Sequence, residues 1–175
     1  MKSTHLLLAA FGLLASCKEN APTVTVAPSG PSESLSRVLD ARPEGEARAI
    51  HLVRTEVKPG DVITIRGRIM GNSKPFVEGR AVFILGDPEV LTPCNEIPGD
   101  ECETPWDTCC DSSEDKKRGI ASVQVVGADG KVLKEGIEGV GGLEKLAWVT
   151  VTGSVADGSS VDLLLINAQA IDVGE

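Results

Sequence analysis

Residues 62–69 read Val-Ile-Thr-Ile-Arg-Gly-Arg-Ile, with apolar and polar side chains in alternation over most of the stretch. A period of two residues is typical of a β-strand that buries one of its faces. Ile63, Ile65 and Ile69 fall on one face of this strand, and Gly67 lies between them. A glycine inside a strand fits the place where a small barrel must bend sharply. The stretch therefore predicts a half-buried, bent strand.

Four more segments with strand-like patterns follow residue 69, and short turns that contain Gly, Asn or Asp separate several of them. A short helix is predicted over residues 46–57, before the first strand, where apolar residues recur at helical spacing. A second small helix is predicted at residues 143–146, between the third and fourth strands. The four further strands are predicted at residues 80–85, 120–126, 147–155 and 161–171.

This order of elements predicts an all-β fold with small α content. Five strands with a small helix between the third and the fourth match the OB-fold order. We therefore expect a five-stranded OB-fold-like barrel with a cysteine-rich insertion between strands 2 and 3. The rival all-β architecture is an immunoglobulin-like sandwich, which needs about seven strands. Beyond the five strands, the chain offers only a weak sixth segment at residues 132–133.

The beginning of the chain carries an export signal. A basic residue and an apolar run over residues 6–15 predict a signal peptide at residues 1–16. The run is too short to span a bilayer, which takes about 20 apolar residues. It ends in Leu14-Ala15-Ser16-Cys17, which resembles the lipobox of bacterial lipoproteins. The resemblance implies cleavage before Cys17 and a covalent lipid on its thiol; a plain secretory signal is the alternative.

The resemblance to lipoproteins also implies a location. Lys18, rather than aspartate, follows the cysteine, and in Gram-negative lipoproteins this favours the outer membrane, facing the periplasm. Residues 17–43 are rich in Pro, Ser, Ala and Thr, so we expect a lipidated N-terminus and a flexible tether. One helical turn is expected within the tether at residues 35–39. The folded domain is expected at residues 44–175.

A narrower resemblance rests on four segments. They are Arg66-Gly67-Arg68-Ile69, then Glu78-Gly79-Arg80-Ala81-Val82-Phe83, then Pro-Cys-Asn-Glu-Ile-Pro-Gly-Asp at 93–100 and Pro-Trp-Asp-Thr-Cys-Cys at 105–110. Together they resemble a group of uncharacterised OB-fold-like lipoproteins from planctomycete-type bacteria. The resemblance implies the same architecture for this chain, but it implies no activity, because that group of proteins has none that can be transferred.

The insertion, residues 87–119, contains Cys94, Cys102, Cys109 and Cys110. In an exported protein, an even set of cysteines is by default a set of disulfides. A bond between the adjacent Cys109 and Cys110 would be strained. We therefore expect two disulfides, in which these two residues reach back separately, one to Cys94 and the other to Cys102.

A four-thiolate metal site is the main alternative for these cysteines. Zinc sites usually place two cysteines two to four residues apart. Here seven, six and no residues separate successive cysteines, so the spacing argues against zinc and no metal is expected. A thiol-redox role lacks the C-x-x-C motif. The many acidic residues of the insertion show no calcium-loop pattern, which favours a solvated acidic face.

Composition narrows the function classes. A net charge of −9 opposes non-specific binding to nucleic acid. Because His5 lies in the predicted signal, a Ser-His-Asp site would have to use His51, and no motif supports one.

OB-folds often bind oligosaccharides or oligonucleotides on one barrel face. Trp148 is expected to be either exposed or covered by the insertion. The possible ligand face consists of Arg66, Arg68, Arg80, Trp106 and Trp148.

The leading interpretation is a non-enzymatic, lipid-anchored binding or envelope-associated module outside the cytoplasm. Its expected partners are the membrane, through the lipid on Cys17, and an unknown protein or cell-wall ligand; nucleic acid is not expected. No catalytic residue and no cofactor besides the lipid are expected. The first alternative is a metal-binding or thiol-redox protein that uses the insertion. The second is oligosaccharide or nucleic-acid binding on the barrel face.

Overall fold

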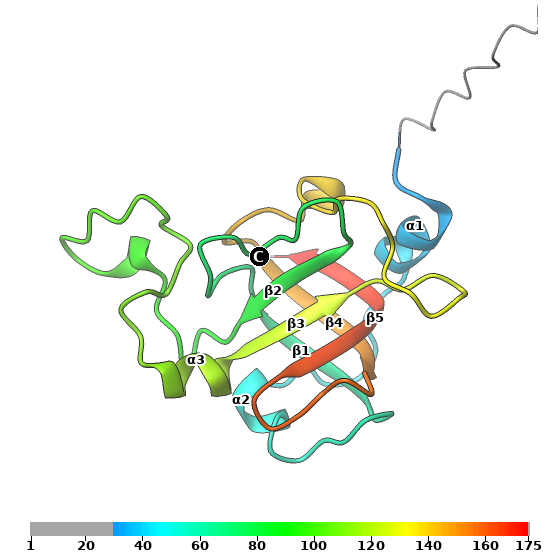
Figure 1. Cartoon of the computed structure of the whole chain (residues 1–175), viewed down its shortest axis with the longest axis horizontal. Coiled ribbons are helices and arrows are strands. Elements are labelled where there is room, and N and C mark those ends of the chain that lie inside the picture. Colours follow the sequence, from blue (N-terminus) through cyan, green and yellow to red (C-terminus); the bar gives the residue numbers. More distant parts are fainter. Residues whose placement is uncertain (1–29, 175) are drawn as a thin grey trace, which may run out of the picture.

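The computed structural model describes residues 30–174, so the predicted signal peptide, Cys17 and the predicted tether up to residue 29 lie outside the described residues. Five strands close into one barrel in the order β1-β2-β3-β5-β4 (Figure 1). All neighbouring strands are antiparallel except β3 and β5, which are parallel. This confirms the all-β, OB-fold-like barrel. The strands are β1 (Val62–Arg68), β2 (Val82–Gly86), β3 (Ile120–Gln124), β4 (Trp148–Val155) and β5 (Leu164–Gly174).

Gly67 lies where β1 passes close to β2. A Cβ atom at Gly67 would lie 2.5 Å from the carbonyl oxygen of Gly86 and 2.9 Å from the Cγ atom of Leu85. Arg68 is the β1 residue that pairs with β2, and its partner is Gly86. The two strands therefore cross closely at one point, where a side chain on Gly67 would keep them apart. Gly67 was predicted to mark a bend, and the structure explains this glycine by the close crossing.

The core follows the predicted alternation. The side chains that point into the barrel from β1, β2 and β4 are fully or almost fully buried, whereas Val62 and Arg66 on the outer face of β1 are exposed. Ile63 is only half-buried. Because inward-facing side chains fill the interior of a small barrel, the centre of this one is a packed core rather than a channel. The buried residues of these strands include Ile65, Phe83, Leu85, Val149 and Val151.

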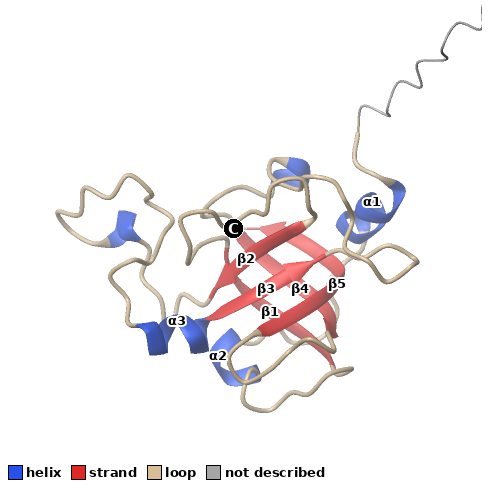
Figure 2. Ribbon diagram, in the orientation of Figure 1, coloured by secondary structure: helices blue, strands red, loops and turns tan. Residues whose placement is uncertain are grey.

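Helices cover the barrel from outside (Figure 2). The helix predicted over residues 46–57 is shorter in the structure, because Arg48 is extended and bonds to β1: its N–H donates to Thr64 and its carbonyl accepts from Arg66. The small helix predicted at residues 143–146 is instead the turn η2, before Leu143. The helical elements are α1 (Glu33–Asp40), α2 (Ile50–Val53), α3 (Ser113–Gly119) and the 3₁₀ turns η1 (Cys94–Glu96) and η2 (Val140–Gly142).

The folded unit starts earlier in the sequence than predicted, because it includes the helix α1. We expected a flexible tether to residue 43, with a single helical turn inside it. In the structure α1 packs against β5, and it buries Leu35 completely and Val38 almost completely. Ser32 caps the helix by accepting a hydrogen bond from the N–H of Leu35. The folded unit therefore begins about twelve residues before the predicted boundary at residue 44, because apolar side chains of α1 belong to the core.

The last strand also differs from its prediction. Residues 161–171 were expected to be extended, but β5 begins at Leu164. A turn closed between Ser160 and Leu163 precedes it, and Val161 is 86 % exposed within that turn. The strand then continues to Gly174, because β4 offers pairing partners as far as Trp148.

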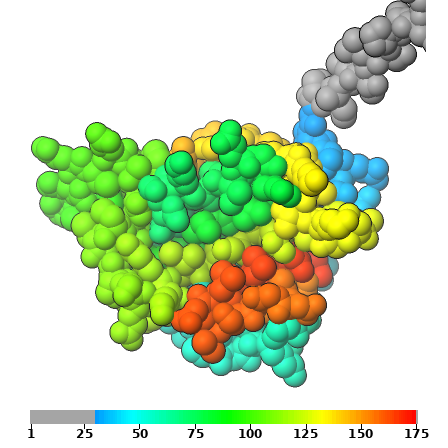
Figure 3. All heavy atoms as spheres, viewed as in Figure 1, coloured from blue at the N-terminus to red at the C-terminus, as the bar shows by residue number. Residues whose placement is uncertain are grey.

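The insertion and α1 lie on opposite sides of the barrel (Figures 1 and 3). The insertion projects beyond the strands as a separate lobe, whereas α1 lies where the described chain begins. Within residues 30–174, none of the helices has the length and apolar character needed to cross a membrane.

Candidate functional site

The insertion folds back on itself through backbone hydrogen bonds. The N–H of Cys94 donates to the carbonyl of Asp107 at 2.8 Å, and the N–H of Asn95 donates to that of Pro105 at 3.0 Å. These two bonds join the start of the insertion to its later half. As a result Cys94, in the turn η1, comes to lie beside Cys109 although the two are fifteen positions apart in the sequence.

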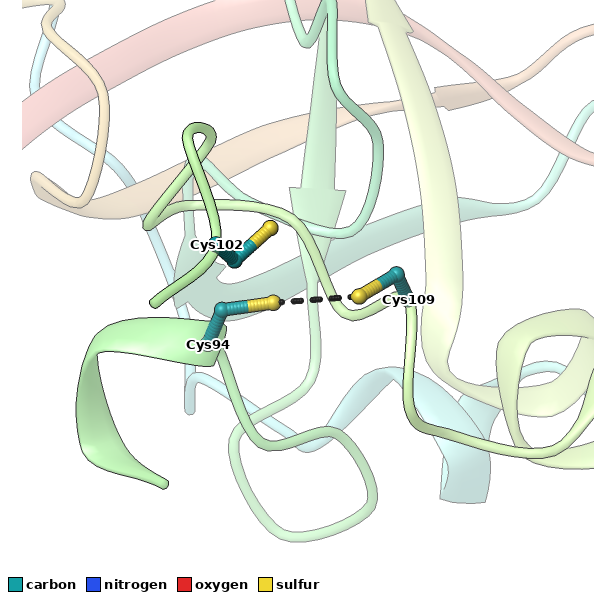
Figure 4. Close-up of side chains that lie close together, drawn as sticks. All are labelled: Cys94, Cys102 and Cys109. Atoms are coloured by element: carbon teal, nitrogen blue, oxygen red, sulfur yellow. Dashed lines mark hydrogen bonds between the residues drawn. The ribbon is translucent and has the colours of Figure 1, made fainter. Parts of the chain in front are cut away.

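Three thiols converge in this loop. The Sγ atoms of Cys94 and Cys109 are 3.4 Å apart, and the Sγ atoms of Cys94, Cys102 and Cys109 all lie within 4.8 Å of one another. Figure 4 shows the three sulfur atoms directed toward a common space from three separate pieces of backbone. Cys94 is buried, Cys102 is half-buried and Cys109 is exposed. The group therefore reaches from the interior of the insertion to its surface.

The fourth cysteine lies beside the group. The Sγ atom of Cys110 is 3.9 Å from that of Cys109 and 3.9 Å from the Oδ2 atom of Asp100. Cys110 is exposed. It belongs to the same lobe but lies outside the set of three sulfurs that are mutually close.

The two predicted disulfides are not formed. All four described cysteines are free, and their closest sulfurs are 3.4 Å apart, whereas a disulfide bond is about 2.05 Å long. The prediction also required one of the adjacent cysteines to reach Cys102. The Cys102 sulfur lies within 4.8 Å of the Cys109 sulfur but is not bonded to it, and it lies 3.4 Å from the hydroxyl of Thr104. None of the four described cysteines is therefore at disulfide bonding distance from another, and three of the sulfurs form a close group.

The thiols differ in acidity because their surroundings differ. Burial is the main reason why the pKa of the Cys94 thiol is raised to about 12. The hydroxyl of Thr104 and then its backbone lower the pKa of Cys102 through hydrogen bonds to its sulfur. The pKa of the exposed Cys109 thiol is also raised: a hydrogen bond with Cys94 lowers it, but the hydrogen bond with Cys110 and desolvation outweigh that contact. Cys102 is thus the thiol of the three that is most readily deprotonated.

Sequence spacing missed this convergence. The rule of two to four intervening residues describes cysteines that share one tight turn. Here each sulfur comes from a different segment: the turn η1, the bend at Cys102 and the turn at Cys109. The prolines and acidic residues of the insertion carry no signal for that arrangement, because it depends on long-range backbone hydrogen bonds.

Trp106 attaches the insertion to the barrel. Its Nε1–H donates to the carbonyl of Ser73 at 3.0 Å, and its own carbonyl accepts from the N–H of Gly71 at 3.1 Å. The Nζ atom of Lys145 lies 4.3 Å from the centre of its ring. Trp106 therefore holds the cysteine-rich insertion on the barrel and does not offer a free aromatic surface. It lies four positions after Cys102 in the sequence.

The predicted ligand face is only partly assembled. Arg66 and Arg68 lie over the ring of Trp148, with their Cζ atoms 4.8 Å and 5.8 Å from its centre. Arg66 and Trp148 line a small hollow of about 150 Å³, to which Asp172 also contributes. Trp148 is half-buried, and its ring is in contact with these guanidinium groups. A ligand would have to displace an arginine to stack there.

The other two members of the predicted face lie elsewhere. Trp106 is packed against Lys145, as described above. Arg80 precedes β2 and its N–H donates to the carbonyl of Val77, whereas Arg68 pairs with the other end of β2, at Gly86. The basic strip predicted from these arginines is therefore not continuous.

His51 has a buried partner that the sequence did not suggest. Its Nδ1 atom is 2.8 Å from the Oδ2 atom of Asp87, which is fully buried. The same carboxylate accepts the backbone N–H of His51 at 2.9 Å and that of Glu89 at 3.0 Å. Asp87 thus joins α2 to the end of β2, and the histidine takes part in that structural connection.

Comparisons of the chain with protein-family models, with curated proteins and with solved structures returned no match.

Proposed function

We propose that this chain is a lipid-anchored, non-enzymatic binding module that acts outside the cytoplasm and presents its cysteine-rich insertion away from the membrane. One observation carries this proposal: α1, where the described chain begins, and the insertion lie on opposite sides of the barrel (Figures 1 and 3). A chain attached to lipid through Cys17 approaches the barrel from the α1 side. The opposite side, with the thiol lobe, is then left free for a ligand.

The packing of α1 supports this arrangement. Leu35 and Val38 seat the helix against β5, so the barrel is joined to the preceding chain through a fixed element rather than a loose one. A fixed helix gives the barrel a preferred orientation at the point where the tether ends. Lys18, after the candidate lipid-bearing cysteine, favours the outer membrane facing the periplasm.

Binding at the barrel face is less well supported. Arg66 and Arg68 lie on the ring of Trp148, and Lys145 lies on that of Trp106. Oligonucleotide-binding surfaces, in contrast, offer open aromatic platforms. The acidic net charge also opposes nucleic acid. We therefore place the binding function on the insertion.

The anchor is tested by fractionation of cells that express the full chain. The wild type should sediment with membranes and incorporate a radiolabelled fatty acid, whereas Cys17→Ser should be unlabelled and retain its signal peptide. Cys110→Ser is the matched control, because it removes an exposed thiol of the insertion and should leave labelling unchanged. Protease added to spheroplasts should cut the wild type. An unlabelled wild type in the soluble fraction would contradict the anchor.

A further inference from the structure

We propose that Cys94, Cys102 and Cys109 bind one thiophilic metal ion, for which zinc(II) is the expected occupant, and that Cys110 is not one of its required ligands. This inference goes beyond the proposed function, which assigns no ligand to the insertion. It also stands independently of the lipid anchor. The observation that carries it is the mutual approach of the three sulfurs to within 4.8 Å.

The distances fit an ion better than covalent bonds. Zinc–thiolate bonds of about 2.3 Å in a tetrahedral site separate neighbouring sulfurs by roughly 3.8 Å. The Cys94 and Cys109 sulfurs are 3.4 Å apart, and no pair in the group exceeds 4.8 Å. A disulfide would require about 2.05 Å, and it would join two sulfurs and leave the third over. Three converging thiols match the soft ligands that zinc and copper(I) prefer.

Backbone hydrogen bonds position two of the three cysteines, and the third follows a buried residue. The N–H of Cys94 is fixed by the Asp107 carbonyl at 2.8 Å. The N–H of Cys102 donates to the Asp100 carboxylate at 2.8 Å. Cys109 follows Thr108, which is completely buried. Ligands that are positioned before the ion arrives lose little conformational entropy on binding, which favours affinity.

Groups around the sulfurs suit a bound cation. The Thr104 hydroxyl lies 3.4 Å from the Cys102 sulfur, so it can donate a hydrogen bond to a thiolate there. Such contacts orient ligands and tune metal affinity. The carboxylates of Asp100 and Asp107 accept backbone N–H groups in the same lobe, close to the ligands in the chain. Their negative charge favours the approach of a cation.

The exposed side leaves room for a fourth ligand. Cys109 is exposed while Cys94 is buried, so an ion among the three sulfurs would face solvent on one side. Zinc with three protein ligands takes water or another molecule as its fourth ligand. Cys110 is 3.9 Å from the Cys109 sulfur only, and adjacent cysteines chelate a single ion poorly. We therefore assign the required set to three thiols.

Native mass spectrometry and metal analysis of the full chain test the site. The protein is isolated from the cell envelope without chelators or reductants. We expect about one zinc ion per chain and, after denaturation with a chelator, free thiols at Cys94, Cys102, Cys109 and Cys110, located by alkylation and peptide mapping. A copper(I) content in place of zinc would overturn the choice of zinc and keep the three-thiol site. A chain four protons lighter than its reduced mass, without metal, would overturn the site itself.

Single cysteine variants identify the ligands. Zinc affinity should fall by at least about tenfold in Cys94→Ser, Cys102→Ser and Cys109→Ser, and it should stay within about threefold of wild type in Cys110→Ser. An equal loss in Cys110→Ser would overturn the three-ligand assignment. Titration of the wild type with cadmium(II) does not depend on variant folding: its thiolate charge-transfer absorption should correspond to three sulfurs, and a four-sulfur intensity would overturn that assignment.

Discussion

Arg68 of β1 forms an ion pair with Glu96, which lies in η1 two residues after Cys94. The side chain of Arg68 is only 14 % exposed, and its Nε–H also donates to the carbonyl of Leu146 at 3.2 Å. Its guanidinium lies over the ring of Trp148. One well-held arginine therefore connects the barrel to the segment that carries the first thiol of the group.

Glu96→Gln should loosen the insertion without unfolding the barrel. Glu96 is 51 % exposed, so we expect the free energy of unfolding to change by less than about 1 kcal/mol. Amide hydrogen exchange in residues 94–109 should nevertheless become faster. Glu33→Gln is the control, because it removes an exposed ion pair with Arg37 far from the insertion. Equal exchange rates in wild type and Glu96→Gln would contradict the connection.

Gly67→Ala should weaken closure of the barrel. The new methyl group would lie 2.5 Å from the Gly86 carbonyl oxygen, so β1 and β2 would have to move apart. We expect a loss of about 1–3 kcal/mol in the free energy of unfolding, measured in urea. Gly136→Ala is the matched control, since nothing lies within 4 Å of its Cβ position. A change no larger than that of the control would contradict the close crossing.

Leu35→Ala should destabilise the whole folded unit, because the Leu35 side chain of α1 is fully buried where the helix packs against β5. Replacing a buried leucine with alanine costs about 2–5 kcal/mol. Arg37→Ala in the same helix serves as the control, since its side chain is 71 % exposed. The measurement is the thermal midpoint, monitored by circular dichroism. If Leu35→Ala melted with the control, α1 would not be part of the core.

Ser112→Ala should raise the pKa of Asp115 toward its ordinary value. The Ser112 hydroxyl donates to the Asp115 carboxylate at 2.7 Å and is the largest cause of the lowered pKa of Asp115, ahead of Arg118. Because the folded-state pKa is lowered, the stabilisation of α3 by this group is fully present above the unfolded pKa. It is lost as the pH falls through the folded pKa.

Carbon-13 detected titration of the Asp115 carboxyl checks this expectation. The midpoint should move upward in Ser112→Ala and by a smaller amount in Arg118→Gln, since Arg118 is the lesser cause. A larger shift in Arg118→Gln would reverse the assigned order of causes.

Local patterns in the sequence were enough to predict the barrel. Alternation with a period of two depends on which face of a strand is buried, so Ile65, Ile69 and Phe83 were assigned correctly to the buried face. Thr64 was assigned to the open face but is buried, because its hydroxyl bonds to the Glu44 carbonyl and to Thr152. The glycine in β1 was correctly identified as a special position, because a glycine in a strand interior often marks a bend or a close approach of backbones. The boundaries of β5 and α2 were less predictable. The bridge at Arg48 depends on Ile65, which lies far along the chain. The turn at Val161 is local, closed between Ser160 and Leu163, but alternation alone did not distinguish it from strand.

The sequence by itself determined the class of fold, the order of the strands and the position of the insertion, because these follow from local alternation and turn chemistry. Only the tertiary structure decided that α1 belongs to the core, since two apolar residues become a buried face only when β5 lies opposite. It also decided the state of the cysteines. Backbone hydrogen bonds between distant parts of the insertion bring three sulfurs together. The spacing of the cysteines along the sequence does not predict those hydrogen bonds.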